Sequence, residues 1–272
     1  GPAGIARVKG ELLDALDPSG LAVLVADDPA TPALRARTGA RVLLVSGANA
    51  GAEADADVRA REIRLDAVLR PTFVLESAWG SGAVHLAVRG LHQVVNASLA
   101  AAVALAAGVS FDDVVSSLAT VQPAAGRMEV VQAPDGLVVL DDTYNANPAS
   151  TAAAVRALAS VGEVHHRIAV IGDMRELGPM SNAEHAAIGQ LVAEARVDVL
   201  VTVGHETPPM AATARAGGVA VIETADAAEA CKVVPALVSA GDAVLVKGSR
   251  AIGLEAVAAA LLADRRAEGD AP

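Results

Sequence analysis

Apolar residues in the first part of the chain predict an α/β layer. A helical pattern over residues 5–16 precedes two short apolar runs, LAVLVA from Leu21 and RVLLVS from Arg41. Short apolar runs that alternate with helical segments are typical of parallel strands covered by helices. The chain is therefore expected to begin with a helix that is followed by two parallel strands.

The pattern changes in the next part of the chain. Residues 58–65, 72–77 and 83–90 alternate between apolar and polar, which predicts antiparallel strands joined by tight turns. An alanine-rich helix then ends at Gly108, and a second helix follows with Ser110 as its N-cap. These elements complete a first unit.

The remaining residues alternate regularly between strand-like and helix-like patterns. About five apolar runs separated by helical segments predict a doubly wound, mostly parallel sheet with right-handed crossovers. The runs are 136–142, 167–173, 197–204, 219–223 and 242–248. We expect two domains, residues 1–122 and residues 123–272, with the segment 121–131 as the crossing between them.

Composition bounds the class of protein. Hydrophobic residues make up 53% of the 272 positions, enough for a substantial core, and Asp, Arg or Pro interrupts every apolar run before it reaches the ~18 residues of a membrane span. The first residues do not resemble a secretory signal, and the single Cys231 leaves no internal disulfide, so a cytoplasmic protein is expected. The net charge of −11 and an aromatic content of 1% argue against a nucleic-acid partner, because such binding needs basic patches or stacking rings.

Polar residues gather where the strands of the second domain end. They occupy the segments 141–148, 172–178, 204–206 and 247–250. Ligands of open parallel sheets bind just beyond the carboxyl ends of the strands, so these acids, amides and cations are expected to converge on one edge. Aspartate, asparagine and glycine are also ordinary loop formers and helix caps, which explains any single loop equally well. Four such loops on one edge favour a site for a polar substrate and a nucleotide.

Six short motifs follow one another along the chain. They are KGEL from Lys9, HQVVNASLAA from His92, GRMEV from Gly126, DDTYNANP from Asp141, GDMRELG from Gly172 followed by His185, and KGSR from Lys247. In this order the motifs resemble the Mur ligase family over essentially the whole sequence. DDTYNANP together with GDMRELG resembles the branch that adds D-alanyl-D-alanine, because the ligase that adds the third amino acid would carry histidine where Tyr144 stands.

The resemblance implies a particular domain organisation. The family has a substrate-binding amino-terminal domain, a central ATPase domain and a carboxy-terminal Rossmann-like domain. Residues 1–122 then correspond to the carboxy-terminal half of the central ATP-binding domain, and residues 123–272 to the last domain. The sequence contains no G-x-x-x-x-G-K-[ST] motif, the loop that cradles nucleotide phosphates. We therefore expect a fragment that is inactive by itself, and the initial Gly1-Pro2 resembles a protease scar. The protein is also expected to be a monomer.

The implied reaction joins a carboxylate to an amine. ATP phosphorylates the carboxylate of UDP-N-acetylmuramoyl-tripeptide, and the amine of D-alanyl-D-alanine attacks the resulting acyl phosphate to form an amide. Since anions must approach one another, Mg²⁺ and cationic side chains are expected in the site.

The resemblance also assigns the metal and the nucleotide to five residues. Lys9 matches a carbamylated lysine whose carbamate supports Mg²⁺, with an ordinary surface lysine as the alternative. Asn96 matches an asparagine that reads adenine, with a polar helix face as the alternative. Arg127 matches an arginine that contacts the nucleotide from the interdomain linker, or else forms a surface ion pair. Asp142 matches an acid that holds the ribose hydroxyls, and Tyr144 of the same motif is placed with it.

Seven further residues are candidates for binding D-alanyl-D-alanine and the acyl phosphate, which need cations, helix amides and acceptors. They are Asn145, Asn147, Arg175, Glu176, Lys247, Ser249 and Arg250. Asn147-Pro148 also resembles an N-cap with proline at the first helical position. His185 matches a family position and could equally cap or pack its helix.

Other functions stay open on the sequence. A non-catalytic binding or scaffold module would retain the same fold without turnover. A related ligase would act on folate or another amino acid, although DDTYNANP argues against it. A dinucleotide-dependent oxidoreductase is disfavoured, because no G-x-G-x-x-G motif follows a strand.

Overall fold

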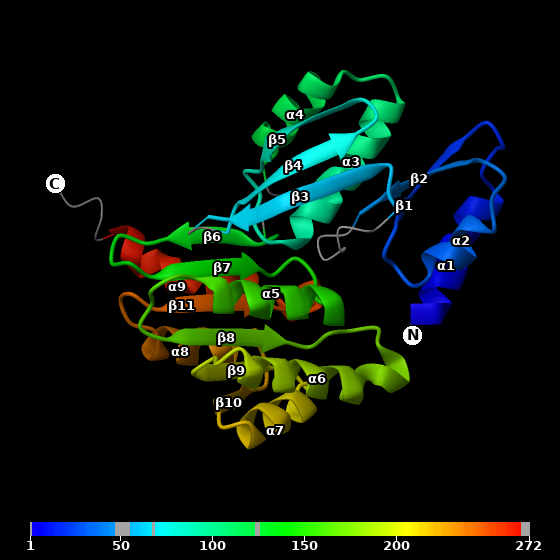
Figure 1. Ribbon diagram of the computed structural model, residues 1–272. Helices are drawn as coiled ribbons and strands as arrows, with labels where there is room; N and C mark the ends of the chain where they lie inside the picture. Colours follow the sequence, from blue (N-terminus) through cyan, green and yellow to red (C-terminus); the bar gives the residue numbers. More distant parts are fainter. Residues whose placement is uncertain (1, 47–54, 67–68, 123–125, 268–272) are drawn as a thin grey trace. The chain divides into compact units, whose positions relative to one another are not determined.

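The chain folds into two compact units, each with its own sheet and core (Figure 1). The structure is a computed structural model that describes residues 2–46, 55–66, 69–122 and 126–267. Unit 1 comprises Gly1–Asp66 with Arg70–Gln122, and unit 2 comprises Ala67–Leu69 with Pro123–Pro272.

Unit 1 is built on a five-stranded sheet in the order β1-β2-β3-β4-β5. Its strands are β1 (Leu21–Val25), β2 (Arg41–Val45), β3 (Val58–Leu65), β4 (Pro71–Ser77) and β5 (Gly80–His85). β1, β2 and β3 run parallel, and β3, β4 and β5 run antiparallel, which confirms the two predicted patterns. The last strand differs from the expected 83–90, because a two-residue connection pairs Ser77 with Gly80 and so starts the strand earlier.

The helices of unit 1 cover this sheet or flank it. They are α1 (Pro2–Asp14), α2 (Thr31–Arg35), α3 (His92–Ala106) and α4 (Phe111–Thr120). α3 packs on β1 to β4, and its Ala101 and Leu105 join Phe73 and Leu75 in the core. α4 begins as predicted, since the backbone N–H of Asp113 donates to the Ser110 hydroxyl over 3.2 Å.

Unit 2 is built on a six-stranded sheet in the order β10-β9-β8-β11-β7-β6. Its strands are β6 (Glu129–Gln132), β7 (Val138–Asp142), β8 (Arg167–Gly172), β9 (Val199–Val203), β10 (Ala220–Thr224) and β11 (Ala243–Lys247). All run parallel except β6, which confirms the predicted α/β class with a mostly parallel sheet. Residues 121–131 were expected to form the crossing between domains, but residues 129–131 belong to β6, which pairs with β7. Residues 123–125 lie outside the described residues.

Helices pack on both faces of this sheet (Figure 1). α5 (Pro148–Ser160), α6 (Ser181–Glu194) and α7 (Pro208–Ala216) share one core, and α8 (Ala227–Leu237) and α9 (Glu255–Ala267) share the other. Successive residues of β8 alternate between these cores, with Ile171 facing α5 to α7 and Val170 facing α8 and α9. Burial on both faces explains why the strands are continuous apolar runs. Each of the described helices, in either unit, is too short or too polar to cross a membrane.

The strand order places β11 between β8 and β7. The chain proceeds from β7 to β8, β9 and β10, and then returns through α8 to form β11 inside the sheet. The segments that leave β7, β8 and β11 therefore emerge side by side at one edge. Such a reversal of winding is where open α/β sheets bind their ligands.

Candidate functional site

Lys247, the last residue of β11, ties two strand ends together. Its Nζ lies 2.7 Å from Asp142 Oδ2 and donates a 2.8 Å hydrogen bond to the carbonyl oxygen of Asn145. The side chain is 1% exposed, and this burial lowers the pKa of Lys247, while the Asp142 carboxylate acts in the opposite direction. Lys247 thus anchors the segment after β7 to the end of β11.

Asp142 uses its second oxygen to fix the turn before β6. Its Oδ1 accepts a 3.0 Å hydrogen bond from the backbone N–H of Met128, a residue with a left-handed φ of 51°. The backbone N–H of Tyr144 donates to the carbonyl oxygen of Gly126 over 2.9 Å. The turn that carries Arg127 is therefore bonded directly to the segment after β7.

Two arginines from different segments meet at the ring of Tyr144. The guanidinium carbon of Arg127 lies 4.1 Å from the ring centroid, and that of Arg250 lies 5.3 Å from it. Tyr144 is 40% exposed, and both arginines are exposed. The negative face of the ring attracts both cations, which offsets part of their mutual repulsion and leaves donors available for an anion.

The two asparagines of the DDTYNANP segment serve the backbone. Asn147 caps α5: its Oδ1 accepts from the N–H of Ser150 over 2.8 Å, and its own N–H donates to the Ser150 hydroxyl over 3.1 Å. This confirms the N-cap prediction, with Pro148 at the start of the helix. Asn145 Oδ1 accepts from the N–H of Ala146 over 2.9 Å, and both asparagines remain exposed.

The segment after β8 carries exposed Arg175 and Glu176 on a buried base. The N–H of Asp173 donates to the Val203 carbonyl over 3.1 Å, and the N–H of Arg175 donates to the Ser249 hydroxyl over 3.0 Å. The N–H of Ser249 in turn donates to the Asp173 carbonyl over 3.2 Å. Ser249 is 6% exposed, so its hydroxyl joins the segments after β8 and β11.

Three residues that are not among the predicted site residues organise the same edge. Asp173 is 3% exposed, and its Oδ1 accepts from the N–H of Glu206 over 2.9 Å. Gly204 has a φ of 114°, and a Cβ there would lie 2.5 Å from the Asp173 carboxyl group. The sequence signals were available for two of them: Asp173 is an acid directly after the buried strand β8, and Gly204 is a glycine directly after β9.

Lys9 and Asn96 belong to unit 1. Lys9 is an exposed residue of α1, and Asn96 is an exposed residue of α3 whose Nδ2 donates to Gln93 Oε1 over 3.0 Å. Nowhere in the described part of the chain do three or more His, Cys, Asp or Glu residues gather as a metal site. The role of Lys9 in holding Mg²⁺ stays a prediction.

The structure brings the predicted residues of unit 2 to one edge of its sheet. They lie on the turn before β6, at the last residues of β7 and β11, or on the segments that leave β7, β8 and β11: Arg127, Asp142, Tyr144, Asn145, Asn147, Arg175, Glu176, Lys247, Ser249 and Arg250. Lys247, Asp142 and Ser249 bond to protein groups that hold the segments together. Arg127, Arg175 and Arg250 expose their side chains, an arrangement suited to carboxylate or phosphate groups. The contact of each residue with nucleotide or dipeptide stays a prediction.

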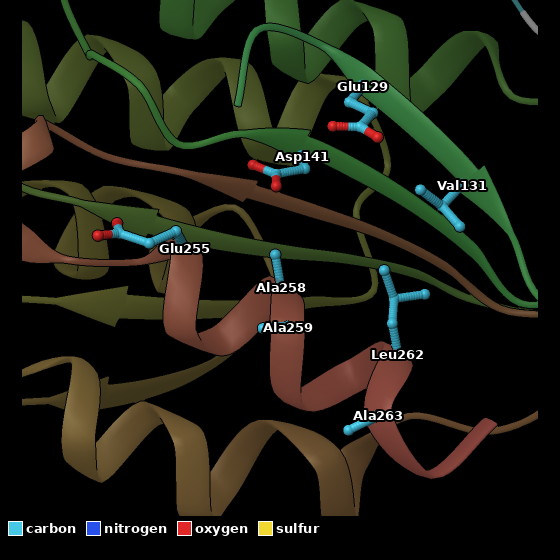
Figure 2. Close-up of a pocket in the computed structure, with 8 residues that line it drawn as sticks. All are labelled: Glu129, Val131, Asp141, Glu255, Ala258, Ala259, Leu262 and Ala263. Carbon is cyan, nitrogen blue, oxygen red and sulfur yellow. The ribbon is translucent and has the colours of Figure 1, made fainter. Parts of the chain in front are cut away.

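A separate groove lies between β6, β7 and α9, with a volume of about 330 Å³ (Figure 2). Glu129, Asp141 and Glu255 bring carboxylates to it, and alanines of α9 with Leu262 line its apolar part. Asp141 Oδ1 accepts from the Thr143 hydroxyl over 2.7 Å. None of the predicted site residues lines this groove.

Two family models match the chain, one over most of each unit. The model described as Mur ligase middle domain matches residues 3–104, and the model described as Mur ligase, glutamate ligase domain matches residues 126–250. Together they span both sheets.

Relatives with one name agree with these matches. The UDP-N-acetylmuramoyl-tripeptide--D-alanyl-D-alanine ligase of Mycobacterium tuberculosis is 41% identical over 96% of this chain and 54% of its own length. That of Escherichia coli is 33% identical over 95% of this chain and 56% of its own length. A crystal structure of MurF from Acinetobacter baumannii matches 97% of this chain and 56% of its own with a TM-score of 0.84 and 33% identity. The chain thus spans about half the length of the curated relatives it matches. With the middle and carboxy-terminal domain types both present, the chain belongs to the Mur ligase family.

Proposed function

We propose that the chain forms part of an ATP-dependent ligase that joins D-alanyl-D-alanine to UDP-N-acetylmuramoyl-tripeptide in peptidoglycan synthesis. The observation that carries the proposal is the 41% identity, over 96% of the chain, to a ligase named for that reaction. The exposed arginines at the edge of unit 2 support it, because the dipeptide carries a carboxylate and the nucleotide carries phosphates.

The two units would divide the work. Residues 1–122 would be the carboxy-terminal half of the central ATP-binding domain, and residues 123–272 the carboxy-terminal domain. Lys9 would carry a carbamate that supports Mg²⁺, and Asn96 would read the adenine edge with its amide. Mg²⁺ would supply charge neutralisation between the phosphate and the carboxylate.

The side chains at the edge of unit 2 would bind the reactants. Arg127 and Tyr144 would contact the nucleotide, with Asp142 close to the ribose. Arg175 is our choice for the carboxylate of the dipeptide, because its guanidinium is exposed while its backbone is fixed by Ser249.

The remaining candidates of unit 2 have smaller parts in this proposal. Asn145 and Glu176 would offer acceptors to the dipeptide amine. Arg250 would face the phosphate of the acyl phosphate from the ring of Tyr144. Lys247, Ser249 and Asn147 would act mainly by shaping the loops, since each bonds to backbone groups.

The decisive experiment restores the portion of the ligase that the relatives possess and that this chain does not match. That portion of the Mycobacterium tuberculosis relative is joined to the chain or added in trans. ATP, Mg²⁺, UDP-N-acetylmuramoyl-tripeptide and D-alanyl-D-alanine are then supplied, and the pentapeptide product is measured by mass spectrometry. Formation of the pentapeptide supports the ligase, whereas a folded, nucleotide-binding complex without turnover supports a scaffold. Ligation of glutamate to folate, or of a single amino acid, would identify a different ligase of the family.

The 272 residues alone are expected to release no phosphate from ATP above background. The physical reason is that the sequence contains no G-x-x-x-x-G-K-[ST] loop to hold the β- and γ-phosphates. A colorimetric phosphate assay on the purified chain, with and without both substrates, measures this. ATP-dependent phosphate release that persists through a second purification step would contradict the expectation.

Replacement of Arg175 by alanine is expected to raise the KM for D-alanyl-D-alanine about tenfold or more in the restored ligase. A charge-assisted hydrogen bond is worth about 1.5–3 kcal/mol, which corresponds to roughly ten- to hundredfold in affinity. The KM for ATP is expected to stay within about twofold. Arg156→Ala on the exposed side of α5 is the matched control and should leave both constants unchanged. Equal losses for ATP and dipeptide would remove Arg175 from the dipeptide site.

The cellular setting follows from the substrates. UDP-linked peptidoglycan precursors are used in the cytoplasm, so we place the enzyme there, and we propose that it acts as a monomer. Gel filtration of the restored ligase with light scattering tests the second point.

A further inference from the structure

His185 is a fully buried histidine at the base of the Arg175 segment. It lies on α6 with an exposed fraction of 0%. Its Nε2 accepts a 3.1 Å hydrogen bond from the backbone N–H of Met174, and its Nδ1 lies 2.8 Å from the carbonyl oxygen of Ser181. A backbone N–H can only donate and a carbonyl oxygen can only accept. The contacts therefore assign the single ring proton to Nδ1 and leave Nε2 as an acceptor on a neutral imidazole.

The hydrogen bond to His185 completes a set of three consecutive amides. The N–H groups of Asp173, Met174 and Arg175 donate to the Val203 carbonyl, to His185 and to the Ser249 hydroxyl. These acceptors come from the end of β9, from α6 and from the segment after β11. The backbone below Arg175 is thus held from three directions, and His185 supplies the middle one.

The other side of the imidazole belongs to a closed circuit of hydrogen bonds. The hydroxyl of Ser181 donates to the Glu206 carboxylate and lies 3.2 Å from His185 Nδ1. The N–H of Glu206 donates to Asp173 Oδ1 over 2.9 Å. These hydrogen bonds link Asp173 through Glu206 and Ser181 to His185. The bond from the N–H of Met174, the residue after Asp173, to His185 closes the circuit. Groups on both sides of the imidazole therefore restrain its orientation.

We propose that His185 is a positioning residue, whose neutral Nδ1–H form fixes the Asp173–Met174 backbone and thereby aims the Arg175 guanidinium. The identity of the ligand that Arg175 meets, D-alanyl-D-alanine, rests on the proposed function. The inference that His185 fixes the Asp173–Met174 backbone does not rest on the proposed function. A histidine that only filled space in the core would tolerate an apolar residue of similar size without effect on Arg175.

The first test uses NMR spectroscopy of the 272-residue chain, without ligand. Nitrogen shifts of the His185 ring at neutral pH should show a proton on Nδ1 and none on Nε2. His185→Leu should raise the exchange rate of the Met174 amide by about tenfold or more, because that buried amide loses its acceptor. His185→Gln, whose amide oxygen can accept the same hydrogen bond, should retain most of the protection. His205→Leu, at an exposed histidine after β9, is the matched control and should change neither.

Two results would overturn the proposal. One is a proton on Nε2 in the unaltered chain, and the other is an unchanged Met174 exchange rate in a folded His185→Leu variant. If His185→Leu does not fold, the ring protonation and the His185→Gln variant carry the decision. In that case, faster exchange of the Met174 amide in a folded His185→Gln variant would also contradict the proposal.

The second test measures ligation by the restored enzyme. His185→Leu should raise the KM for D-alanyl-D-alanine about tenfold and leave the KM for ATP within about twofold, and His185→Gln should recover most of the loss. A lower melting temperature with an unchanged dipeptide KM would reduce His185 to a packing residue. If even the unaltered protein fails to ligate, the proposed function fails, while the NMR result still decides the role of His185.

Discussion

Replacement of Lys247 by methionine is expected to lower the free energy of unfolding of unit 2 by about 3 kcal/mol, as typically found when one partner of a buried ion pair is removed. Methionine fills a similar volume but leaves the Asp142 carboxylate without its cation and the Asn145 carbonyl without its donor. The segment after β7 then loses its link to β11. Chemical denaturation followed by circular dichroism measures the change, and the dipeptide KM of the restored ligase is expected to rise with it.

Two further variants separate the ion pair from a general effect of losing a lysine. Lys232→Met, at an exposed position of α8, should change the free energy of unfolding by no more than about 0.5 kcal/mol. Asp142→Asn added to Lys247→Met should recover about 1 kcal/mol or more, because the unpaired charge is removed. If the double variant is no more stable than Lys247→Met, the buried charge is not the cause of the loss.

The pH dependence of stability reports the burial of Lys247, an effect opposite to that of its ion pair. Burial lowers the pKa of Lys247 in the folded chain from its usual 10.5. At pH values between this lowered pKa and 10.5, the unfolded chain binds the proton more tightly than the folded chain does. The contribution of Lys247 to stability should therefore rise with pH across that window, and this component should be missing from Lys247→Met.

Replacement of Gly204 by alanine is expected to cost about 3 kcal/mol of folding free energy and to disturb the edge that carries Arg175. The new Cβ would lie 2.5 Å from the Asp173 carboxyl group, and the φ of 114° is itself unfavourable for alanine. Asp173 must then move, and its hydrogen bond from the N–H of Glu206 is expected to break. Thermal and chemical denaturation measure the first effect, and amide shifts of residues 173–175 report the second.

Gly218→Ala is the control for backbone strain. Gly218 has a φ of 90°, but a Cβ at this position would meet no atom within 4 Å. Its replacement should cost about 1 kcal/mol and leave the shifts of residues 173–175 in place. Equal losses for the two variants would mean that the collision with Asp173 contributes nothing.

The elements of unit 2 could be predicted because its strands are buried on both faces. β8, β9 and β11 then consist of apolar residues bounded by polar ones, a pattern that local sequence displays directly. β6 was not predicted, because four residues are too few for a period and the strand depends on pairing with β7. β5 was placed too late because it begins with glycines, which are rare in strands. Those glycines accommodate the ring of Phe111, which lies 2.8 Å from where a Cβ of Gly80 would stand.

The region of the site was easier to predict than the direction of its side chains. The order of strands and loops indicated that Asp142, Arg175 and Lys247 would gather at one edge, and the strand order places all three there. Lys247 pairs with Asp142, and the Arg175 backbone bonds to Ser249. A motif does not state where a side chain points, so the sequence did not show that the Lys247 ammonium lies against Asp142, and its contact with the dipeptide stays a prediction. His185 was ambiguous for a related reason, since its partner Met174 is 11 positions away and contributes only a backbone amide.

The place of β11 between β7 and β8 also bears on how unit 2 is made. This central strand begins at Ala243, after all its neighbours have left the ribosome. Until then β7 and β8 have no common partner, and each presents a row of unpaired backbone groups that can bind other chains. Unit 2 should therefore close its sheet only after β11 has been synthesised, and a product terminated before Ala243 would contain α5 to α8 yet be prone to aggregate.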